Sequence, residues 1–344
     1  MKHSHWVHKN TSIKLTLISL WLILQLFTMK AMAMQIEEPE YFLQLDVHEF
    51  PRMLVVNGVV IEKDQSGKGT SATAFPINHW IKNGENTLEL HYGPENFIKK
   101  RTHQNSRCNV SIVVKGKVGG KKISYKVADL SYVPNYDIPL SERFKGSMPA
   151  GRYTYSEKES KPTTDKGDFS IGAVQADSDK YDQRGNRIYR TFTADVPFPK
   201  WAFFSADKIY SYPRTNENYD GMKLKVWPML LKLWDLFESK KIDKILPLFE
   251  ARSKELDMAY YREPGYSIKS FEHDLKNIYK AGYPLDRIDF EQMKLIVAYN
   301  EKLFTIANAA DSTGTVMFYD KKDNTNTFFN MYWMKKDGKW SIIR

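Results

Sequence analysis

The sequence predicts a mainly β chain that ends in an α+β unit. Asn57-Gly58, Gly119-Gly120 and Asp337-Gly338 each lie between runs of β-branched and aromatic residues, as is typical of two-residue hairpin turns. Apolar residues at helical spacing occur between residues 227 and 279, just before the last strands. The expected architecture is an N-terminal antiparallel β-sandwich followed by three helices packed on a curved antiparallel sheet.

The N-terminal half has the residue pattern of β-strands. Residues 41–48 alternate apolar and polar side chains, the period of a strand with one buried face. The turn at Asn57-Gly58 places four apolar residues on one side: Leu54, Val56, Val59 and Ile61. The turn at Gly119-Gly120 sets Gly116 opposite Ile123, Val114 opposite Tyr125, and Ile112 opposite Val127. Both hairpins therefore bury one consistent face.

Further strands are expected at residues 168–176 and 187–196, with a last one at 201–210, after a long surface connection over residues 132–155. The sandwich is therefore expected to cover residues 34–212. A separate small unit beginning at about residue 140 is the alternative. The polar residues 213–221 are the expected linker to a second unit at 222–344.

Three amphipathic helices are predicted after the linker, and the first is expected to begin at Pro228, which suits a first turn. Their apolar stripes are Trp227, Leu230, Leu231, Trp234 and Phe237; Ile242, Ile245, Leu246 and Phe249; and Ile268, Phe271, Leu275, Ile278 and Tyr279. Gly282 is placed to end the third helix.

The last part of the chain predicts five strands in a meander. Three are expected at residues 295–299, 303–307 and 315–320, and a hairpin over 327–344 follows. Its Asp337-Gly338 turn sets Lys336 opposite Lys339, Lys335 opposite Trp340, and Trp333 opposite Ile342. One face of this hairpin is then apolar and must be covered by the helices.

Two stretches resemble known families. Residues 221–344 resemble the NTF2-like, cystatin-like α+β superfamily in element order, in the segment Ser239–Phe249 at the place of its short second helix, and in the closing segment Lys336–Arg344. The resemblance implies helices packed into the concave side of a bent sheet. Residues 77–92 resemble a turn and central strand of galactose-binding-like jelly rolls. Because the NTF2-like superfamily includes enzymes, binding domains and assembly modules, the resemblance does not choose a function.

Residues 1–33 read as a signal peptide. Basic residues precede the apolar run 15–28, and Ala31-Met32-Ala33 forms a small-x-small cleavage site. The expected mature chain begins near Met34 and is soluble, periplasmic or secreted from a bacterial envelope. Loss of the four lysines in this segment reduces the formal net charge from +10 to +6, which is ordinary for the remaining length. An uncleaved membrane anchor is the alternative.

The candidate ligand-pocket residues lie in the C-terminal unit: Tyr260, Tyr261, Tyr266, Tyr299, Asp311 and Tyr332. The candidate calcium ligands are Asp177, Asp179 and Asp182, although the EF-hand spacing is absent and a solvated hairpin loop is the favoured interpretation. The basic run 99–107 is expected to be an exposed loop, and Cys108, the one cysteine, is expected to be structural. The histidines show no metal-ligand spacing, and no nucleophile or phosphate-binding motif occurs. The sequence thus indicates no catalytic residue, metal or cofactor.

These features favour an exported, non-catalytic protein that acts by protein–protein interaction, as an inhibitor or immunity-type partner. The abundant Tyr and Trp side chains suit contacts with protein or carbohydrate, whereas the basic run lacks the interleaved aromatic residues of a nucleic-acid groove. The alternative is an enzyme or a small-ligand or carbohydrate receptor that uses a pocket in the C-terminal unit.

Overall fold

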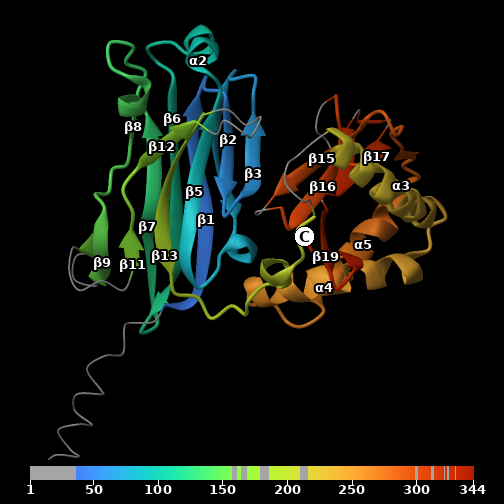
Figure 1. Ribbon diagram of the computed structural model, residues 1–344. Coiled ribbons are helices and arrows are strands. Elements are labelled where there is room, and N and C mark those ends of the chain that lie inside the picture. Colours follow the sequence, from blue (N-terminus) through green and yellow to red (C-terminus); the bar gives the residue numbers. More distant parts are fainter. Residues whose placement is uncertain are drawn as a thin grey trace, which may run out of the picture.

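The computed structural model describes residues 36–156, 161–163, 169–178, 186–209, 216–298, 301–310, 314–320, 322–323, 325–329 and 331–344. Its N-terminal unit consists of two antiparallel sheets packed face to face, and its C-terminal unit has three helices with antiparallel sheets (Figure 1). The predicted fold class is confirmed. Among the described residues, none of the helices has the length and apolar character needed to cross a membrane.

The first sheet of the sandwich has the strand order β4-β1-β6-β7-β8. Its strands are β1 (Glu37–His48), β4 (Thr70–Pro76), β6 (Arg107–Val118), β7 (Lys121–Tyr132) and β8 (Phe144–Lys145). On β1 the inward residues Tyr41, Leu43, Leu45 and Val47 are buried and their neighbours are partly exposed, as the alternating pattern predicts.

The second sheet has the order β10-β9-β11-β13-β5-β2-β3, with β12 paired to β13. The strands are β2 (Arg52–Val56), β3 (Val59–Asp64), β5 (Gly84–Tyr92), β9 (Gly151–Ser156), β10 (Lys161–Thr163), β11 (Phe169–Ile171), β12 (Gln175–Ser178) and β13 (Asn186–Ala194). Strands β9 to β13 therefore lie in the same sheet as β5, and β13 pairs with β5 over its whole length.

The predicted turns form, but two registers differ by a bulge. Asn57 and Gly58 have φ angles of 51° and 75°, as a two-residue hairpin turn requires. Beyond that turn a bulge sets Leu54 opposite Glu62, and beyond Gly119-Gly120 another sets Ile112 opposite Ala128. The predicted partner Val127 is therefore wrong. A bulge inserts one residue into a strand and shifts every later pair.

Three segments of the N-terminal half differ from the prediction. In the predicted strand 201–210, the described residues 201–209 do not form a strand: Trp201 is fully buried before the 3-10 helix η4 (Ala202–Ser205), and its indole donates to the carbonyl of Ile81. The basic residues 99–101 form the last turn of helix α2 (Glu95–Arg101) instead of a loop. The expected surface connection contains η3 (Leu140–Arg143), β8 and β9.

The three predicted helices are α3 (Asn216–Glu238), α4 (Ile242–Ala259) and α5 (Tyr266–Ala281). Gly282 ends α5 in the left-handed conformation with φ 74°, as predicted. The predicted start at Pro228 is wrong because α3 begins twelve residues earlier and also covers residues 216–221 of the expected linker. Met222 and Val226 are buried in that added part, so packing outweighs the loss of one hydrogen bond at proline.

The C-terminal strands form two small sheets instead of the expected five-stranded meander. One sheet has the order β15-β16-β19-β20 and the other β14-β17-β18. Their strands are β14 (Leu285–Asp286), β15 (Met293–Ala298), β16 (Leu303–Asn308), β17 (Val316–Asp320), β18 (Thr325–Phe329), β19 (Tyr332–Lys336) and β20 (Lys339–Ile342). The first half of β16 pairs with β19, and among the described residues a single bridge from Ala307 to Gly314 links β16 towards β17. The Asp337-Gly338 hairpin has the predicted register.

Aromatic side chains fill the space between the helices and these sheets. Trp234 is buried and its indole N–H donates to the carbonyl of Thr315 at 2.6 Å. The other large side chains that are almost fully buried here are Phe237, Phe249, Phe304 and Phe318. The interior of the C-terminal unit is therefore a packed core.

Candidate functional site

The two units meet along a seam formed by η2 (Asn78–Trp80), the end of α4 and the last residues of the chain (Figure 1). Asn78 is fully buried there. Its amide oxygen accepts from the N–H of Tyr41 at 2.5 Å, and its amide nitrogen donates to the carbonyls of Pro39 at 3.1 Å and Ala259 at 2.7 Å. One side chain thus ties β1, η2 and α4 together with well-satisfied polar atoms.

Arg344 is the centre of a second set of contacts across the seam. Its guanidinium pairs with Glu255 of α4 and donates to the carbonyl of His79 at 2.9 and 3.2 Å. The same group lies 5.3–5.4 Å from the ring centres of Trp80, Trp201 and Phe203. Burial lowers the pKa of Arg344, but the ion pair and the aromatic rings favour the charged form.

Glu255 and Trp201 extend this set into the connecting segment. The second oxygen of Glu255 accepts from the N–H of Ala202 at 2.8 Å, and the indole of Trp201 donates to the carbonyl of Ile81 at 2.8 Å. The connecting segment is therefore fixed to both units, and the side chains along the seam are held in defined positions.

His79 and Tyr260 form a polar pair across the seam. Nδ1 of His79 lies 2.6 Å from the hydroxyl of Tyr260. Burial, assisted by the positive charges of Arg344 and Arg252, lowers the pKa of His79 well below its ordinary value. Burial likewise raises the pKa of Tyr260. At neutral pH both side chains are uncharged and joined by one hydrogen bond.

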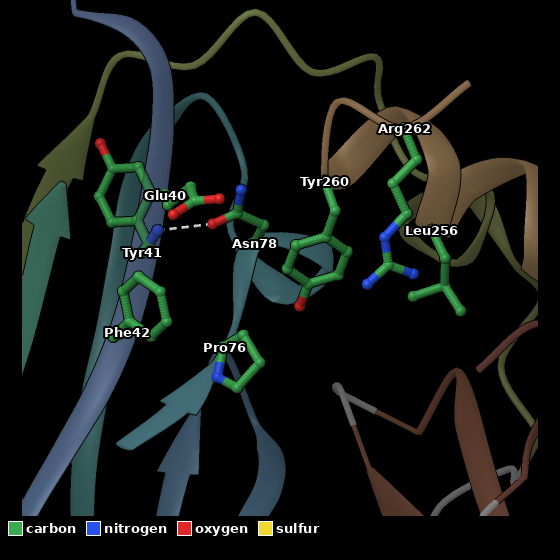
Figure 2. Close-up of a pocket in the computed structure, with 8 residues that line it drawn as sticks. All are labelled: Glu40, Tyr41, Phe42, Pro76, Asn78, Leu256, Tyr260 and Arg262. Atoms are coloured by element: carbon green, nitrogen blue, oxygen red, sulfur yellow. Dashed lines mark hydrogen bonds between the residues drawn. The ribbon is translucent and has the colours of Figure 1, made fainter. Parts of the chain in front are cut away.

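A pocket of about 290 Å³ opens beside this pair (Figure 2). Its lining residues come from β1, β4, η2 and the end of α4: Glu40, Tyr41, Phe42, Pro76, Asn78, Leu256, Tyr260 and Arg262. Figure 2 shows Glu40 on the β1 side, Arg262 on the α4 side and Tyr260 between them. The pocket thus combines apolar walls with one carboxylate and one guanidinium on opposite sides.

Arg262 and Tyr266 continue the pocket onto the surface. The guanidinium of Arg262 lies 5.1 Å from the ring centre of Tyr260 and 5.2 Å from that of Tyr266, and it donates to the hydroxyl of Ser267 at 3.2 Å. Tyr266 is 56% exposed, which is unusual for so large an aromatic side chain. A fixed cation between two tyrosine rings is a typical component of protein interfaces.

The structure describes four of the six predicted pocket residues, and one of them lines the seam pocket. Tyr260 lines the pocket, Tyr261 donates to the carbonyl of Pro39 at 3.3 Å, and Tyr332 donates to the carbonyl of Val60 at 3.4 Å. Tyr266 lies on the surface, on the other side of Arg262 from Tyr260, while Tyr299 and Asp311 lie outside the described residues. Sequence reasoning missed the residues that β1, β4 and η2 contribute, because their partners in α4 are about 180 positions away.

Of the remaining candidate ligands and nucleophiles, Asp177 and Cys108 lie among the described residues. Asp177 accepts from the guanidinium of Arg187 at 2.7 and 2.9 Å, and this hydrogen bonding lowers the pKa of Asp177. The other two calcium candidates, Asp179 and Asp182, lie outside the described residues. Cys108 is fully buried, and burial raises the pKa of its thiol to about 12, which keeps it protonated.

Comparison with protein-family models, curated proteins and solved structures found no match to this chain.

Proposed function

We propose that the mature chain is an exported, non-catalytic binding protein that acts by protein–protein interaction, as an inhibitor or immunity-type partner. In this proposal the C-terminal unit is an NTF2-like domain used for binding, and the contact surface is the seam pocket with Arg262 and Tyr266 at its edge. The chain reaches a bacterial periplasm or the exterior through cleavage of residues 1–33.

The observation that carries the proposal is the composition of this surface. Phe42 and Tyr260 supply apolar contact area, and Glu40 and Arg262 supply one charge of each sign. Aromatic residues and arginine are enriched at protein interfaces because they combine a large contact area with directed hydrogen bonds. The buried seam beneath holds these side chains in place, so binding of a partner costs little conformational entropy for ordering this surface.

The enzyme or receptor alternative requires an open cone in the C-terminal unit. The side chains of Trp234, Phe237 and Phe304 occupy that space, and Tyr260 and Tyr332 point to the seam instead. This packing favours the binding protein over an NTF2-like domain with an internal ligand site.

The test is affinity capture with purified mature protein from an envelope extract of the source bacterium. Arg262→Glu and Tyr266→Ala are the surface variants, because both side chains are exposed and the hydrogen bond of the Arg262 side chain is to Ser267 within its own unit. Lys100→Glu is the matched control, since it makes the same charge change on α2, which lies at the other end of the sandwich (Figure 1).

We expect the wild type and Lys100→Glu to capture the same partner. Both surface variants should capture about tenfold less of it or even smaller amounts, as for an interface hot spot. The same captured proteins at the same yield in all four samples would contradict the proposal.

A further inference from the structure

A second polar cluster lies at the opposite end of β1 from the seam pocket. It consists of His48, Glu49 and His103, whose ligand atoms all lie within 4.8 Å of one another. Glu40 at the pocket and His48 are eight residues apart on one strand, or roughly 26 Å at about 3.3 Å per residue. The cluster is therefore separate from the site described above.

The pairing of β1 with β6 brings the cluster together. His48 is opposite Arg107 in the register, and the chain reaches Arg107 from helix α2 through a short loop that contains His103. Residues 55 positions apart in the sequence thus meet at one end of the sheet. Their sequence spacing matches no metal motif, which is why the sequence did not indicate this site.

His48 is oriented for metal binding. Its Nδ1 lies 2.7 Å from the hydroxyl of Thr70, the residue directly opposite on β4. When Nδ1–H donates to that hydroxyl, Nε2 carries the lone pair. Such an outer partner commonly fixes the tautomer of a metal-bound histidine.

Glu49 is held at the end of β1 by its backbone. It has a φ angle of 46°, in the left-handed region that few non-glycine residues adopt, and its N–H donates to the carbonyl of Gly69 at 2.9 Å. Its carboxylate accepts a hydrogen bond from Nε2 of His103. The two ligand-bearing side chains are thus already in contact.

The loop that carries His103 is anchored at both ends. Thr102 and Ser106 are buried, and Ser106 accepts from the N–H of His103 at 2.9 Å while its own N–H donates to the carbonyl of His103 at 2.9 Å. The ring of His103 lies 5.9 Å from that of His48 at an angle of 77°. Both imidazoles are therefore presented by fixed backbone.

The two guanidinium groups near the cluster in the sequence have other partners. Arg107 donates to both carboxylate oxygens of Asp46 at 3.2–3.3 Å, so its guanidinium is turned towards an acid of β1. The guanidinium of Arg101 stacks on the ring of Phe97 at 3.9 Å. A bound cation would thus be next to two imidazoles and one carboxylate.

From this arrangement we infer that His48, Glu49 and His103 bind a divalent transition-metal ion of the zinc class. Two imidazole nitrogens and one carboxylate oxygen form a zinc donor set, and three protein ligands leave the fourth position of a tetrahedron open to solvent or to a group from a partner. Zinc ligands at about 2.0–2.1 Å lie about 3.3 Å from one another, so the observed spread must close by roughly 1.5 Å.

The side chains of Glu49 and His103 can make that adjustment, because they are 37% and 50% exposed. Metal binding also changes the tautomer of His103. The metal takes the place of the proton on Nε2, and the proton is then carried by Nδ1. Nδ1 can therefore no longer accept the 3.2 Å hydrogen bond from the N–H of Asn105.

The experiment is zinc titration of the full mature chain, purified without a polyhistidine tag, against a chromophoric chelator and by calorimetry. The variants are His48→Ala, Glu49→Gln and His103→Ala. The control is His273→Ala, which removes an exposed histidine from α5. A cobalt(II) titration gives a second readout, since tetrahedral cobalt absorbs strongly in the visible range.

We expect one zinc ion per chain, bound in the micromolar range or tighter, and a tetrahedral cobalt spectrum in the wild type and in His273→Ala. Each site variant should weaken binding by about tenfold or more, because even an outer-shell change costs a metal site about 10- to 100-fold. Calcium should not compete, since it prefers oxygen ligands. No stoichiometric binding, binding unchanged in the three site variants, or displacement by equimolar calcium would each overturn the assignment.

Discussion

Replacement of Arg344 by alanine should uncouple the two units of the protein. The substitution removes the charge that pairs with Glu255, two hydrogen bonds to the carbonyl of His79, and the cation that lies over Trp80 and Trp201. Loss of one partner from a buried ion pair costs about 3–5 kcal/mol, because the other charge remains buried. The total stability of a domain is only about 5–15 kcal/mol, so this seam contribution is large.

The assay is urea unfolding of the mature chain, followed by tryptophan fluorescence and circular dichroism. In the wild type we expect the two signals to change together, because the sandwich core also contains Ala259, Leu303 and Ile343 of the C-terminal unit. In Arg344→Ala the transitions should separate, and the first should move to lower urea. Lys339→Ala, an exposed position in the same hairpin, is the control and should change nothing measurable.

A double variant separates the charge effect from loss of packing. Glu255→Leu with Arg344→Met removes both charges and should recover part of the lost stability, because no unpaired charge remains buried, although the N–H of Ala202 and the carbonyl of His79 lose these hydrogen-bond partners. Two separate transitions already in the wild type, or an Arg344→Ala variant that unfolds like the wild type, would refute the reasoning about the seam.

Two further predictions concern the seam and the closing hairpin. The folded-state pKa of His79 is lowered from an ordinary value of 6.5, so its contribution to stability is present above pH 6.5 and is lost as the pH falls below that value. The urea midpoint of the wild type should therefore fall between pH 7 and pH 5, and His79→Gln should make this fall smaller. Trp333 is 6% exposed and its replacement by alanine should cost about 3–5 kcal/mol, whereas Trp340 is half-buried and should cost about 2 kcal/mol; equal losses in denaturant melts would contradict this ranking.

The sequence predicted the local structure well where one or two residues determine it. Asp337 and Gly338 have φ angles of 50° and 75°. Two consecutive positive φ angles are adopted mainly by pairs such as Asp-Gly and Asn-Gly, so the turn and its register follow from these two residues. Gly282 ends α5 for the same reason. The predicted start of α3 was wrong because a contact with a distant part of the chain helps to determine it. The N–H of Leu295 donates to the hydroxyl of Tyr219, which lies in the part of the helix that the sequence did not predict.

The sheet order of the C-terminal unit could not be predicted from turns alone. A meander requires β16 to pair with β17 along its length, but Phe304 is opposite Trp333 of β19, and their stacked rings lie 6.4 Å apart. Which strand takes a free edge depends on the packing of such side chains against the helices. Alternation in the sequence is the same for either partner.

The two candidate sites illustrate the same limit on a larger scale. Asn78 reads as a polar residue in a turn, yet it is fully buried because the carbonyl of Ala259 completes its hydrogen bonds. His48 reads as the polar face of a strand, yet β6 brings His103 beside it. In both cases a polar side chain gains its role from a partner that the chain delivers only after folding. The useful signal in such a sequence is therefore a polar residue at the end of a predicted strand, examined against the strand it is expected to pair with.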